Sequence, residues 1–248
     1  MISLDSDPKT IENKRQWDRK PVLRAIYHDL YQRIVSAQRP GLTLEIGGGS
    51  GIFKLFEPSI VSMDIRPVPG LDFVADAQRL PLATGTVDNI VLFDVLHHIE
   101  FPALFFAEAD RVLQPRGRVI MIEPAVTWAS WPVYRFIHEE AVALDQDPLA
   151  EGIPDPARAP FDANIALPTL LFGRDRSRFQ GRFKNMRVLR LDWLSCFAYP
   201  LSGGFQPWSL IPSAILRPVL WIEDRLPQFI RRRLAYRLFA VIEKVQAD

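Results

Sequence analysis

The first half of the chain alternates short apolar runs with stretches in which apolar residues recur every three or four positions. The apolar runs carry almost no polar residues, which predicts strands that are covered on both faces of a sheet. The helical spacing predicts helices at 10–38 and 101–113. The five predicted strands lie at 42–46, 60–63, 73–74, 89–93 and 118–122. Short connections between strands and helices indicate a doubly wound α/β domain with a parallel sheet.

The second half of the chain is less regular. Helical spacing predicts a helix at 131–144, followed by a loop rich in proline and aspartate at 145–168. A strand is expected at 188–193, and the run at 236–245 suits either a closing strand or a helix. An apolar, proline-rich segment lies between these last two elements.

Composition narrows the class of protein. The chain has 248 residues, of which 48% are hydrophobic and 24% charged, as in an ordinary folded protein, and it is short for two independent domains. Its net charge of +1 by itself argues neither for nor against a polyanionic partner. The single cysteine, Cys196, excludes an intramolecular disulfide and a cysteine-cluster zinc site. No secretion signal is evident at the N-terminus, so a cytoplasmic protein is expected.

Residues 45–51 read Glu-Ile-Gly-Gly-Gly-Ser-Gly and follow the first predicted strand. Glycine suits a sharp turn at which a ligand approaches main-chain N–H groups with no Cβ in the way. A dinucleotide fingerprint would need a small residue at position 52, which is Ile52, and a P-loop would need a Gly-Lys-Ser/Thr ending that is absent. A nucleophile elbow at Ser50 would need glycine at position 52. The loop therefore fits none of these three motifs.

The order acid-x-Gly-x-Gly-x-Gly does fit, and with four later motifs it resembles the class I S-adenosylmethionine-dependent methyltransferases of the UbiE-like, type 11 kind. The resemblance covers residues 40–125 and rests on LEIGGGSG, VSMDI, VADAQRLPL, VDNIVLFDVLHHI and RVLQPRGRVIMIEP, in this order. It implies a Rossmann-like fold with a mostly parallel seven-stranded sheet and an antiparallel final strand. It also implies S-adenosylmethionine as cofactor and methyl transfer to oxygen, nitrogen or carbon of a small-molecule or lipid-linked acceptor.

The resemblance places the cofactor outside the carboxyl ends of the strands, where ligands of open α/β sheets bind. Asp64 would accept hydrogen bonds from both ribose hydroxyls, and Asp76 with Ala77 would recognise the adenine. Glu45 would lie under the glycine loop and face the methionine end, although each acid also suits a structural role. The expected cofactor-binding residues are Glu45, Gly47, Gly48, Gly49, Gly51, Asp64, Ile65, Asp76, Ala77, Phe93, Asp94 and Val95.

Two adjacent histidines follow the fourth predicted strand, where the methyl acceptor should meet the sulfonium. On a helix, His97 and His98 would point about 100° apart, so they are not expected to share a metal, and no metal is expected. A histidine here can serve as a general base near neutral pH, while simple packing is the alternative. Similarity to histidines at that place in relatives favours His98 as the catalytic residue.

In the family the sheet usually ends with an antiparallel pair of strands, which is assigned here to 186–193 and 236–245. The chain then divides into an N-terminal helical cap at 1–40, a cofactor-binding core at 41–125, and a region at 126–248 that completes the sheet. This last region includes an apolar insertion at about 194–235 and forms part of the acceptor pocket. Candidate residues for lining that pocket, or alternatively the core, are Trp17, Tyr27, Trp128, Trp131, Tyr134 and His138.

Residues 196–222 contain one charged residue, Arg217. Four prolines and a Gly-Gly pair break any spanning helix there, so a loop and an amphipathic helix at about 213–226 are expected. A basic run at 174–190 precedes the segment, and three arginines at 231–233 follow it. The set resembles a patch that rests on anionic lipid. A dimer interface, a lid over the core and, least favoured, a nucleic-acid surface are the alternatives.

The sequence supports three hypotheses about function. The first is methyl transfer to a small or lipid-linked acceptor. The second is a catalytically silent member that serves as a binding or partner subunit, and the third is an RNA or protein methyltransferase. The intact glycine loop and its acids favour the first, and the oligomeric state stays open.

Overall fold

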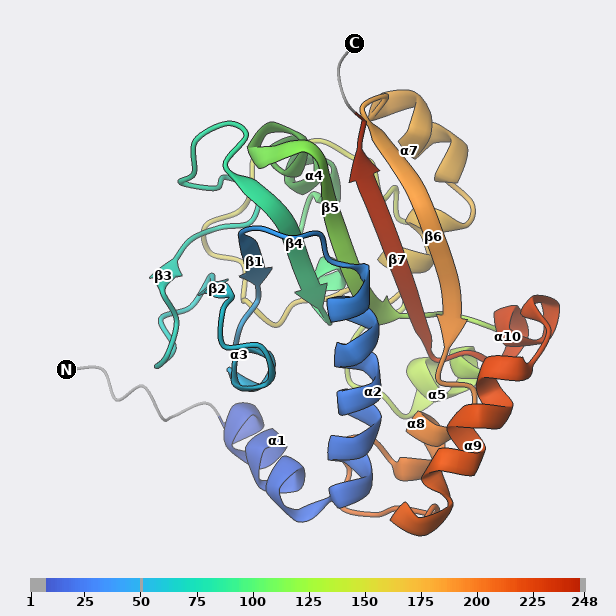
Figure 1. Cartoon of the computed structure of the whole chain (residues 1–248). Helices are drawn as coiled ribbons and strands as arrows, with labels where there is room; N and C mark the ends of the chain where they lie inside the picture. Colours follow the sequence, from blue (N-terminus) through green and yellow to red (C-terminus); the bar gives the residue numbers. More distant parts are fainter. Residues whose placement is uncertain (1–7, 50, 246–248) are drawn as a thin grey trace.

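The computed structural model describes residues 8–49 and 51–245 (Figure 1). Within these ranges, seven strands form one sheet in the order β3-β2-β1-β4-β5-β7-β6. The strands are β1 (Thr43–Ile46), β2 (Val61–Asp64), β3 (Phe73–Val74), β4 (Val87–Phe93), β5 (Leu113–Pro124), β6 (Met186–Leu194) and β7 (Arg237–Lys244). Strands β1 to β5 pair in parallel, and β7 runs antiparallel to both β5 and β6. The predicted mostly parallel, Rossmann-like sheet with an antiparallel end is confirmed.

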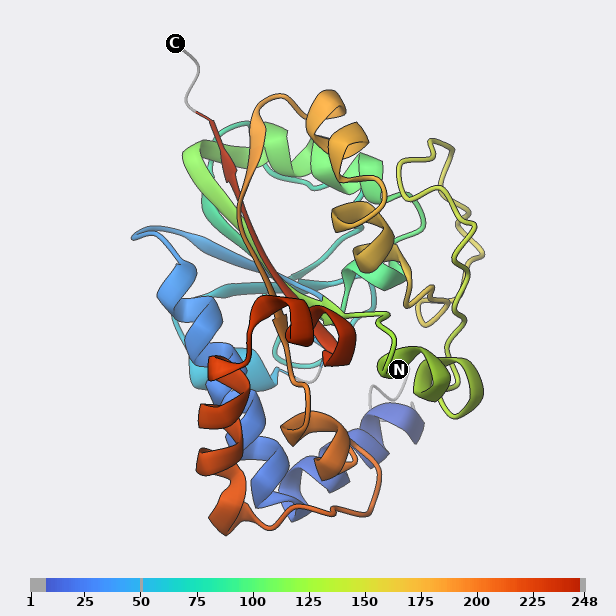
Figure 2. The ribbon, with the colours of Figure 1, turned by 90° about the vertical axis from the view of Figure 1, so that its right-hand side faces the viewer.

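Helices cover both faces of the sheet (Figures 1 and 2). Side chains of β4 show why its sequence is continuously apolar: Ile90 and Leu92 pack into one core, and Val91 packs into the other. The helices on the Ile90 side are α4 (Pro102–Val112), α6 (Leu167–Phe172) and α7 (Arg176–Arg182). Those on the Val91 side are α2 (Pro21–Ala37), α3 (Ile52–Phe56), α8 (Ala198–Ser202) and α9 (Ser213–Arg225).

The prediction of a single helix at 10–38 is wrong. Two helices, α1 (Pro8–Arg19) and α2, meet at Lys20, whose backbone is extended with φ −109° and ψ 92°. Proline disfavours a helical conformation in the residue before it, and Pro21 is the first residue of α2. The chain therefore turns at this point (Figure 1).

The helix predicted at 131–144 is also wrong in its extent. The observed α5 (Ser130–Phe136) ends early, and Ala141 instead forms a parallel bridge with Asn164. The Asn164 side chain reinforces this arrangement, because its Oδ1 accepts a hydrogen bond from the Ala143 N–H at 2.9 Å. A helical pattern of residues thus yields to pairing with a segment more than 20 residues later.

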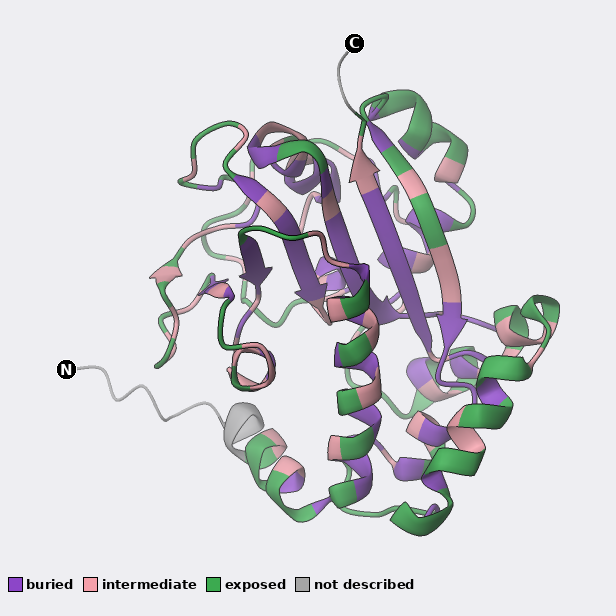
Figure 3. Ribbon diagram, in the orientation of Figure 1, coloured by how far each residue is buried: buried purple, intermediate pink, exposed green. Residues whose placement is uncertain are grey.

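The apolar insertion lies between β6 and β7 and folds as α8, α9 and α10 (Gln228–Leu234). Among the described residues, no helix combines the length and apolarity that crossing a bilayer would need. Exposed residues run along α9 and α10 (Figure 3). The basic helix α7 lies at the opposite end of β6 from these two helices (Figure 1). The two basic regions that flank the insertion in the sequence therefore do not form one surface.

Candidate active site

A cavity of about 400 Å³ opens at the carboxyl ends of β1, β2 and β4. Its walls come from the loop after β1, from the residues that follow β2, β3 and β4, and from a distant loop at 154–161. Small-molecule sites measure roughly 300–1,000 Å³, so the cavity is large enough for a nucleoside-sized ligand.

The glycine loop forms the floor of this cavity. Gly47 has φ +77°, and a Cβ at this position would lie 2.3 Å from Cγ2 of Val95 on the opposite side. Gly48 packs against β2 instead, because its Cβ would lie 1.9 Å from Oγ of Ser62. A side chain at either position would force the loop away from its neighbours. Gly47 and Gly49 line the cavity, whereas Gly48 and Gly51, at the start of α3, do not.

Asp64 ends β2 at the edge of the cavity. One carboxylate oxygen accepts the Gly49 N–H at 3.1 Å, and the other accepts the Arg66 N–H at 2.9 Å. A carboxylate has about four acceptor positions, so each oxygen keeps one for a ligand. The side chain is fixed by the backbone around it and still faces the cavity.

Asp76 belongs to a short hydrogen-bonded chain that joins β3 to α4. Its Oδ1 accepts the Gln78 N–H at 2.8 Å, and Oε1 of Gln78 accepts the Phe101 N–H at 3.0 Å. Gln78 was not predicted as a site residue, yet it lines the cavity beside Asp76 and Ala77. The sequence feature that could have identified Gln78 is its position two residues after Asp76, the acid that follows a strand.

Glu45 does not line the cavity. It is 5% exposed, and its Oε2 accepts the Ser62 hydroxyl at 2.6 Å under the glycine loop. Burial raises the pKa of this carboxyl to about 7, against the hydrogen bond from Ser62, which acts to lower it. The carboxyl is therefore held in contact with β2, behind the loop.

The turn after β4 supplies the inner wall. Asp94 adopts φ +56°, and its Oδ1 accepts a hydrogen bond from Nη1 of Arg237 at 2.6 Å. Arg237 is 3% exposed and lies against the rings of Phe93, Tyr27 and Tyr199. The aromatic side of Phe93 thus faces the arginine and the core, so Phe93 does not line the cavity, while Asp94 does.

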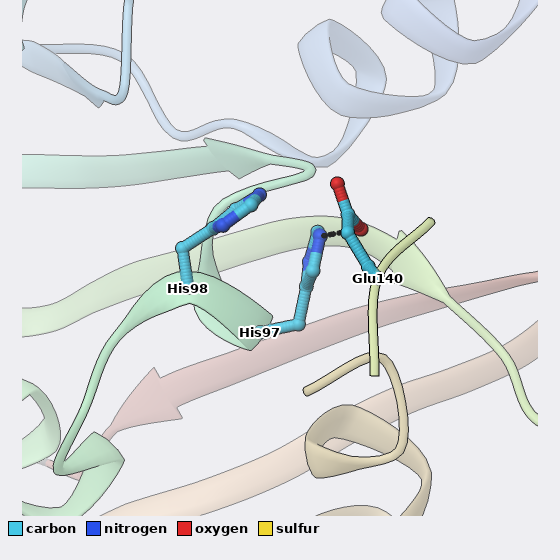
Figure 4. A group of neighbouring side chains, drawn as sticks. All are labelled: His97, His98 and Glu140. Atoms are coloured by element: carbon cyan, nitrogen blue, oxygen red, sulfur yellow. Dashed lines mark ion pairs between the residues drawn. The ribbon is translucent and has the colours of Figure 1, made fainter. Parts of the chain in front are cut away.

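His97 and His98 lie on the short 3-10 helix η1 (Leu96–His98), and their ring centroids are 4.2 Å apart. The prediction that the two side chains diverge is wrong, because side-chain torsions rather than helix geometry set the ring positions. Figure 4 shows the two rings together with Glu140 from the loop after α5. Burial and the neighbouring His97 lower the pKa of His98 to about 4, so its imidazole is neutral.

His97 lies between two carboxylates. Its Nδ1 is 2.7 Å from Oε2 of Glu123, and its Nε2 is 3.5 Å from Oε2 of Glu140. Burial alone would lower the pKa of His97, but these acids raise it to about 10. Glu123 is fully buried, and its other oxygen accepts the Val95 N–H at 2.9 Å, which fixes the turn that forms the cavity wall.

The loop at 154–161 was not predicted to reach the site. Its backbone N–H at Asp155 donates to Oε2 of Glu100 at 2.9 Å, and the Arg66 guanidinium lies 4.4 Å from the Phe161 ring centroid. Proline and aspartate content predicts a loop but gives no information on where that loop packs. Seven of the eight residues of this loop line the cavity.

Nine of the thirteen predicted site residues therefore line one cavity: Gly47, Gly49, Asp64, Ile65, Asp76, Ala77, Asp94, Val95 and His98. Binding of a ligand by these residues stays a prediction. The residues proposed for the acceptor pocket do not line this cavity, and they are Trp17, Tyr27, Trp128, Trp131, Tyr134 and His138. Tyr27 and Tyr134 are buried, and Trp128 is 81% exposed.

Residues 44–121 match the model of a family described as the methyltransferase domain. A stretch of 51 residues is 45% identical to an uncharacterized 37.1 kDa protein in transposon TN4556 of Streptomyces fradiae. This match spans 21% of the chain and only 15% of that protein.

Solved structures share the fold at low identity. A SAM-dependent methyltransferase from Archaeoglobus fulgidus is 13% identical with a TM-score of 0.52, over 89% of this chain and 94% of the other. The [4+2]-cyclase SpnF is 12% identical with a TM-score of 0.51, over 89% of this chain and 81% of the other. A chain in a complex containing the Haloferax volcanii Trm112 methyltransferase activator is 14% identical with a TM-score of 0.52, over 94% of this chain and 94% of the other.

Such likenesses establish the fold, and the cyclase among them shows that this fold also serves other chemistry. The family match covers the part of the chain that builds the cavity. The family match therefore identifies residues 44–121 as a methyltransferase domain within a Rossmann-like fold, with S-adenosylmethionine as its cofactor.

Proposed function

We propose that the chain is a UbiE-like methyltransferase that transfers a methyl group to oxygen, nitrogen or carbon of a small-molecule or lipid-linked acceptor. One observation carries the proposal: the carboxylates of Asp64 and Asp76 line the same cavity as the turns at Gly47 and Gly49. Backbone N–H groups, two acids and apolar lining residues such as Ile46, Met63 and Ile65 are the groups that an adenosyl ligand with a charged methionine tail requires.

Different residues of the cavity would bind different parts of the cofactor. Asp64 would hold the ribose through the free acceptor position on each oxygen, and Asp76 with the Ala77 backbone would hold the adenine. Ile65 would pack on the adenine ring. Glu45 would support the loop from behind through its hydrogen bond with Ser62, and Gly48 and Gly51 shape the loop without lining the cavity. When bound, the cofactor supplies a sulfonium methyl group that needs no further activation.

The chain's own contribution is placement and exclusion of water. Asp94 and Val95, with Phe93 behind them, form the wall toward which an acceptor would approach, and Glu123 holds this wall in place. His98 reaches the cavity as a neutral imidazole and would contact the acceptor there, with one ring nitrogen able to accept a hydrogen bond.

Titration calorimetry with S-adenosylhomocysteine tests this assignment. Wild-type protein is expected to bind one equivalent, and Asp64→Ala to bind at least tenfold more weakly because it loses charge-assisted hydrogen bonds to the ribose. Asp18→Ala, an exposed acid on α1, serves as the matched control and should bind like wild type. Equal affinity in a folded Asp64→Ala protein would remove the basis of the proposal.

The alternatives make distinct predictions. A silent partner subunit would bind S-adenosylhomocysteine but would transfer no methyl group to any member of an acceptor panel. An RNA acceptor gains no support from the basic run at 174–190, because five of its six arginines pair with the chain's own acids. These pairs are Arg174–Asp175, Arg178–Asp147, Arg182–Glu151, Arg187–Glu243 and Arg190–Asp192.

We propose also that the insertion rests on anionic membrane surfaces, which would bring a lipid-linked acceptor to the protein. Ile215, Trp221 and Ile222 on α9 are 47–57% exposed, and the Arg225 guanidinium lies 3.8 Å from the Trp221 ring centroid. Exposed aromatic and aliphatic side chains beside arginines favour the interface of an anionic bilayer. The basic run at 174–190 takes no part, because α7 lies at the far end of β6 (Figure 1).

Flotation with vesicles of phosphatidylcholine and phosphatidylglycerol tests this second proposal. The double variant Trp208→Ala/Trp221→Ala should leave the vesicle fraction, whereas Trp128→Ala, which changes an even more exposed tryptophan near α5, should float like wild type. Recovery of wild type entirely in the soluble fraction would contradict the proposal.

A further inference from the structure

His97, His98 and Glu140 form a cluster (Figure 4), and His98 also lines the cavity. Each offers one ligand atom, and these atoms all lie within 4.8 Å of one another. The histidines come from η1, and the glutamate comes from the loop that replaces the predicted end of α5. The early end of that helix is what brings Glu140 to the histidines.

The distances suit two ligands of one ion better than a hydrogen bond. Nε2 of His97 lies 3.5 Å from Oε2 of Glu140, at the long limit for a hydrogen bond. Two ligands that are each about 2.0–2.1 Å from a tetrahedral Zn²⁺ lie about 3.4 Å apart. The ligand atom of His98 lies within 4.8 Å of the other two, and a rotation of its imidazole would bring it to the ion.

The surroundings of His97 match those of a metal ligand. Nδ1 faces Oε2 of the buried Glu123 at 2.7 Å and Nε2 faces Glu140, so an ion that binds at Nε2 would displace the proton from that nitrogen and leave the proton on Nδ1. Histidines that bind metals commonly donate their second N–H to a carboxylate, which fixes the ring and raises its basicity as a ligand. Glu123 is itself held by the backbone N–H groups of Val95 and Leu96.

An independent observation comes from His98. Its Nδ1 is buried and has no hydrogen-bond partner within the described part of the chain. A buried polar nitrogen without a partner costs free energy, and such sites call for an ion or a water molecule that the protein alone does not provide. An ion in this cluster, or a water molecule bound to that ion, would provide a partner for Nδ1 or for Nε2 of the same ring.

We propose that His97, His98 and Glu140 bind a divalent transition-metal ion of the Zn²⁺ class, with an open position directed toward the cavity. Two histidines, one glutamate and an open fourth position form a ligand set typical of catalytic zinc. The open position would take an oxygen or nitrogen of the methyl acceptor and lower its pKa. In the loaded protein, His98 would then meet the acceptor through the ion. The site itself does not depend on the proposed function, because metal binding is a property of the protein alone.

Calorimetric titration of the chelator-treated full chain with ZnCl₂ tests the site, in the absence of cofactor and acceptor. One equivalent should bind to wild type, and Glu140→Gln and His98→Gln should each bind at least tenfold more weakly. Glu139→Gln, the neighbouring acid outside the cluster, should match wild type. Replacing the supporting carboxylate, as in Glu123→Gln, should weaken binding by about 10–100-fold.

Circular dichroism of each variant separates loss of the site from loss of the fold. Folded wild type that takes up no Zn²⁺, or equal affinity in wild type, Glu140→Gln and His98→Gln, would overturn the proposal and leave His97 as an imidazolium held between two carboxylates. Titration of the same samples with S-adenosylhomocysteine distinguishes the two proposals, since a protein that binds this ligand but no Zn²⁺ contradicts only the metal site.

Discussion

Lys20 connects two segments that lie far apart in the sequence. Its Nζ donates hydrogen bonds to the backbone oxygens of Ser202, Gly204, Gln206 and Trp208 at 2.6–2.9 Å, and the residue is 7% exposed. An ammonium group has three protons for these four oxygens, so it acts as a centre of positive charge for the whole turn. The start of α2 therefore fixes the loop that follows α8.

Lys20→Met tests this role, because it keeps the chain length of the side chain and removes the charge. We expect the free energy of unfolding in urea to fall by about 3 kcal/mol, since buried carbonyl groups lose a charged partner. Amide hydrogen exchange at 202–208 should accelerate as well. Lys14→Met, on the exposed side of α1, should change the unfolding free energy by less than 0.5 kcal/mol, roughly the limit for surface changes. A similarly small loss for Lys20→Met would contradict the argument.

Glu45 gives a pH dependence whose sign is fixed by burial. The folded protein holds the proton of this carboxyl up to its pKa of about 7, whereas the unfolded chain loses it near 4.5. Between these values the folded state binds more protons, so the contribution of Glu45 to stability falls as the pH rises from 4.5 to 7. Glu45→Gln removes the ionisation and keeps an oxygen for the Ser62 hydroxyl.

The free energy of unfolding of Glu45→Gln, relative to wild type, should therefore increase from pH 5 to pH 8 by about 2–3 kcal/mol. Urea unfolding of both proteins across this range measures the difference, in which the other titrating groups cancel. A difference that stays constant with pH would show that Glu45 is ionised throughout.

Local signals account for the site residues that the sequence revealed. Gly47, Asp64 and Asp76 follow three different strands, and parallel strands bring their carboxyl ends to one edge. Arg237 was missed because it lies 143 residues from Asp94, and only the antiparallel return of β7 brings the two together. Contacts between segments so far apart leave no periodicity in the sequence.

Among the helices and strands, the ends of an element were predicted best where both faces of a strand are buried and its sequence is a continuous apolar run. Strands β4 and β5 and the helix at 213–226 were found within a few residues of their observed ends. The helical spacing of apolar residues predicted too long a helix for α5, because pairing of Ala141 with Asn164 competes with the helix. The break at Pro21 carried a clear local signal that the apolar spacing concealed.

Glu223 joins α9 to α8. Its Oε1 accepts the backbone N–H groups of Phe197 and Ala198 at the start of α8, and the residue is 6% exposed. Glu223→Ala should lower the free energy of unfolding by about 2 kcal/mol, because two buried N–H groups lose their acceptor. Urea unfolding measures this loss. Asp224→Ala, which removes an exposed partner of Arg33, should cost less than about 1 kcal/mol. Equal losses would indicate that Glu223 does not cap α8.

The molecule as a whole encloses the cavity with parts from two regions of the chain. The matched domain supplies the floor and inner wall, and the loop at 154–161 supplies the outer wall. This loop is attached to the domain through Glu100 and Arg66. Bound cofactor would therefore lie between the matched domain and this loop, and the loop would open to admit or release the cofactor.

Limited digestion with trypsin measures this opening, because the loop contains one cleavable arginine, Arg158. If cleavage requires a conformation that does not hold the ligand, S-adenosylhomocysteine at 100 times its dissociation constant should slow cleavage at Arg158 by about 100-fold. Cleavage at Arg19, outside the cavity, should keep its rate, and Asp64→Ala should lose the protection at Arg158. Unchanged cleavage at Arg158 in a protein whose binding is established by calorimetry would mean that the loop does not cover the ligand.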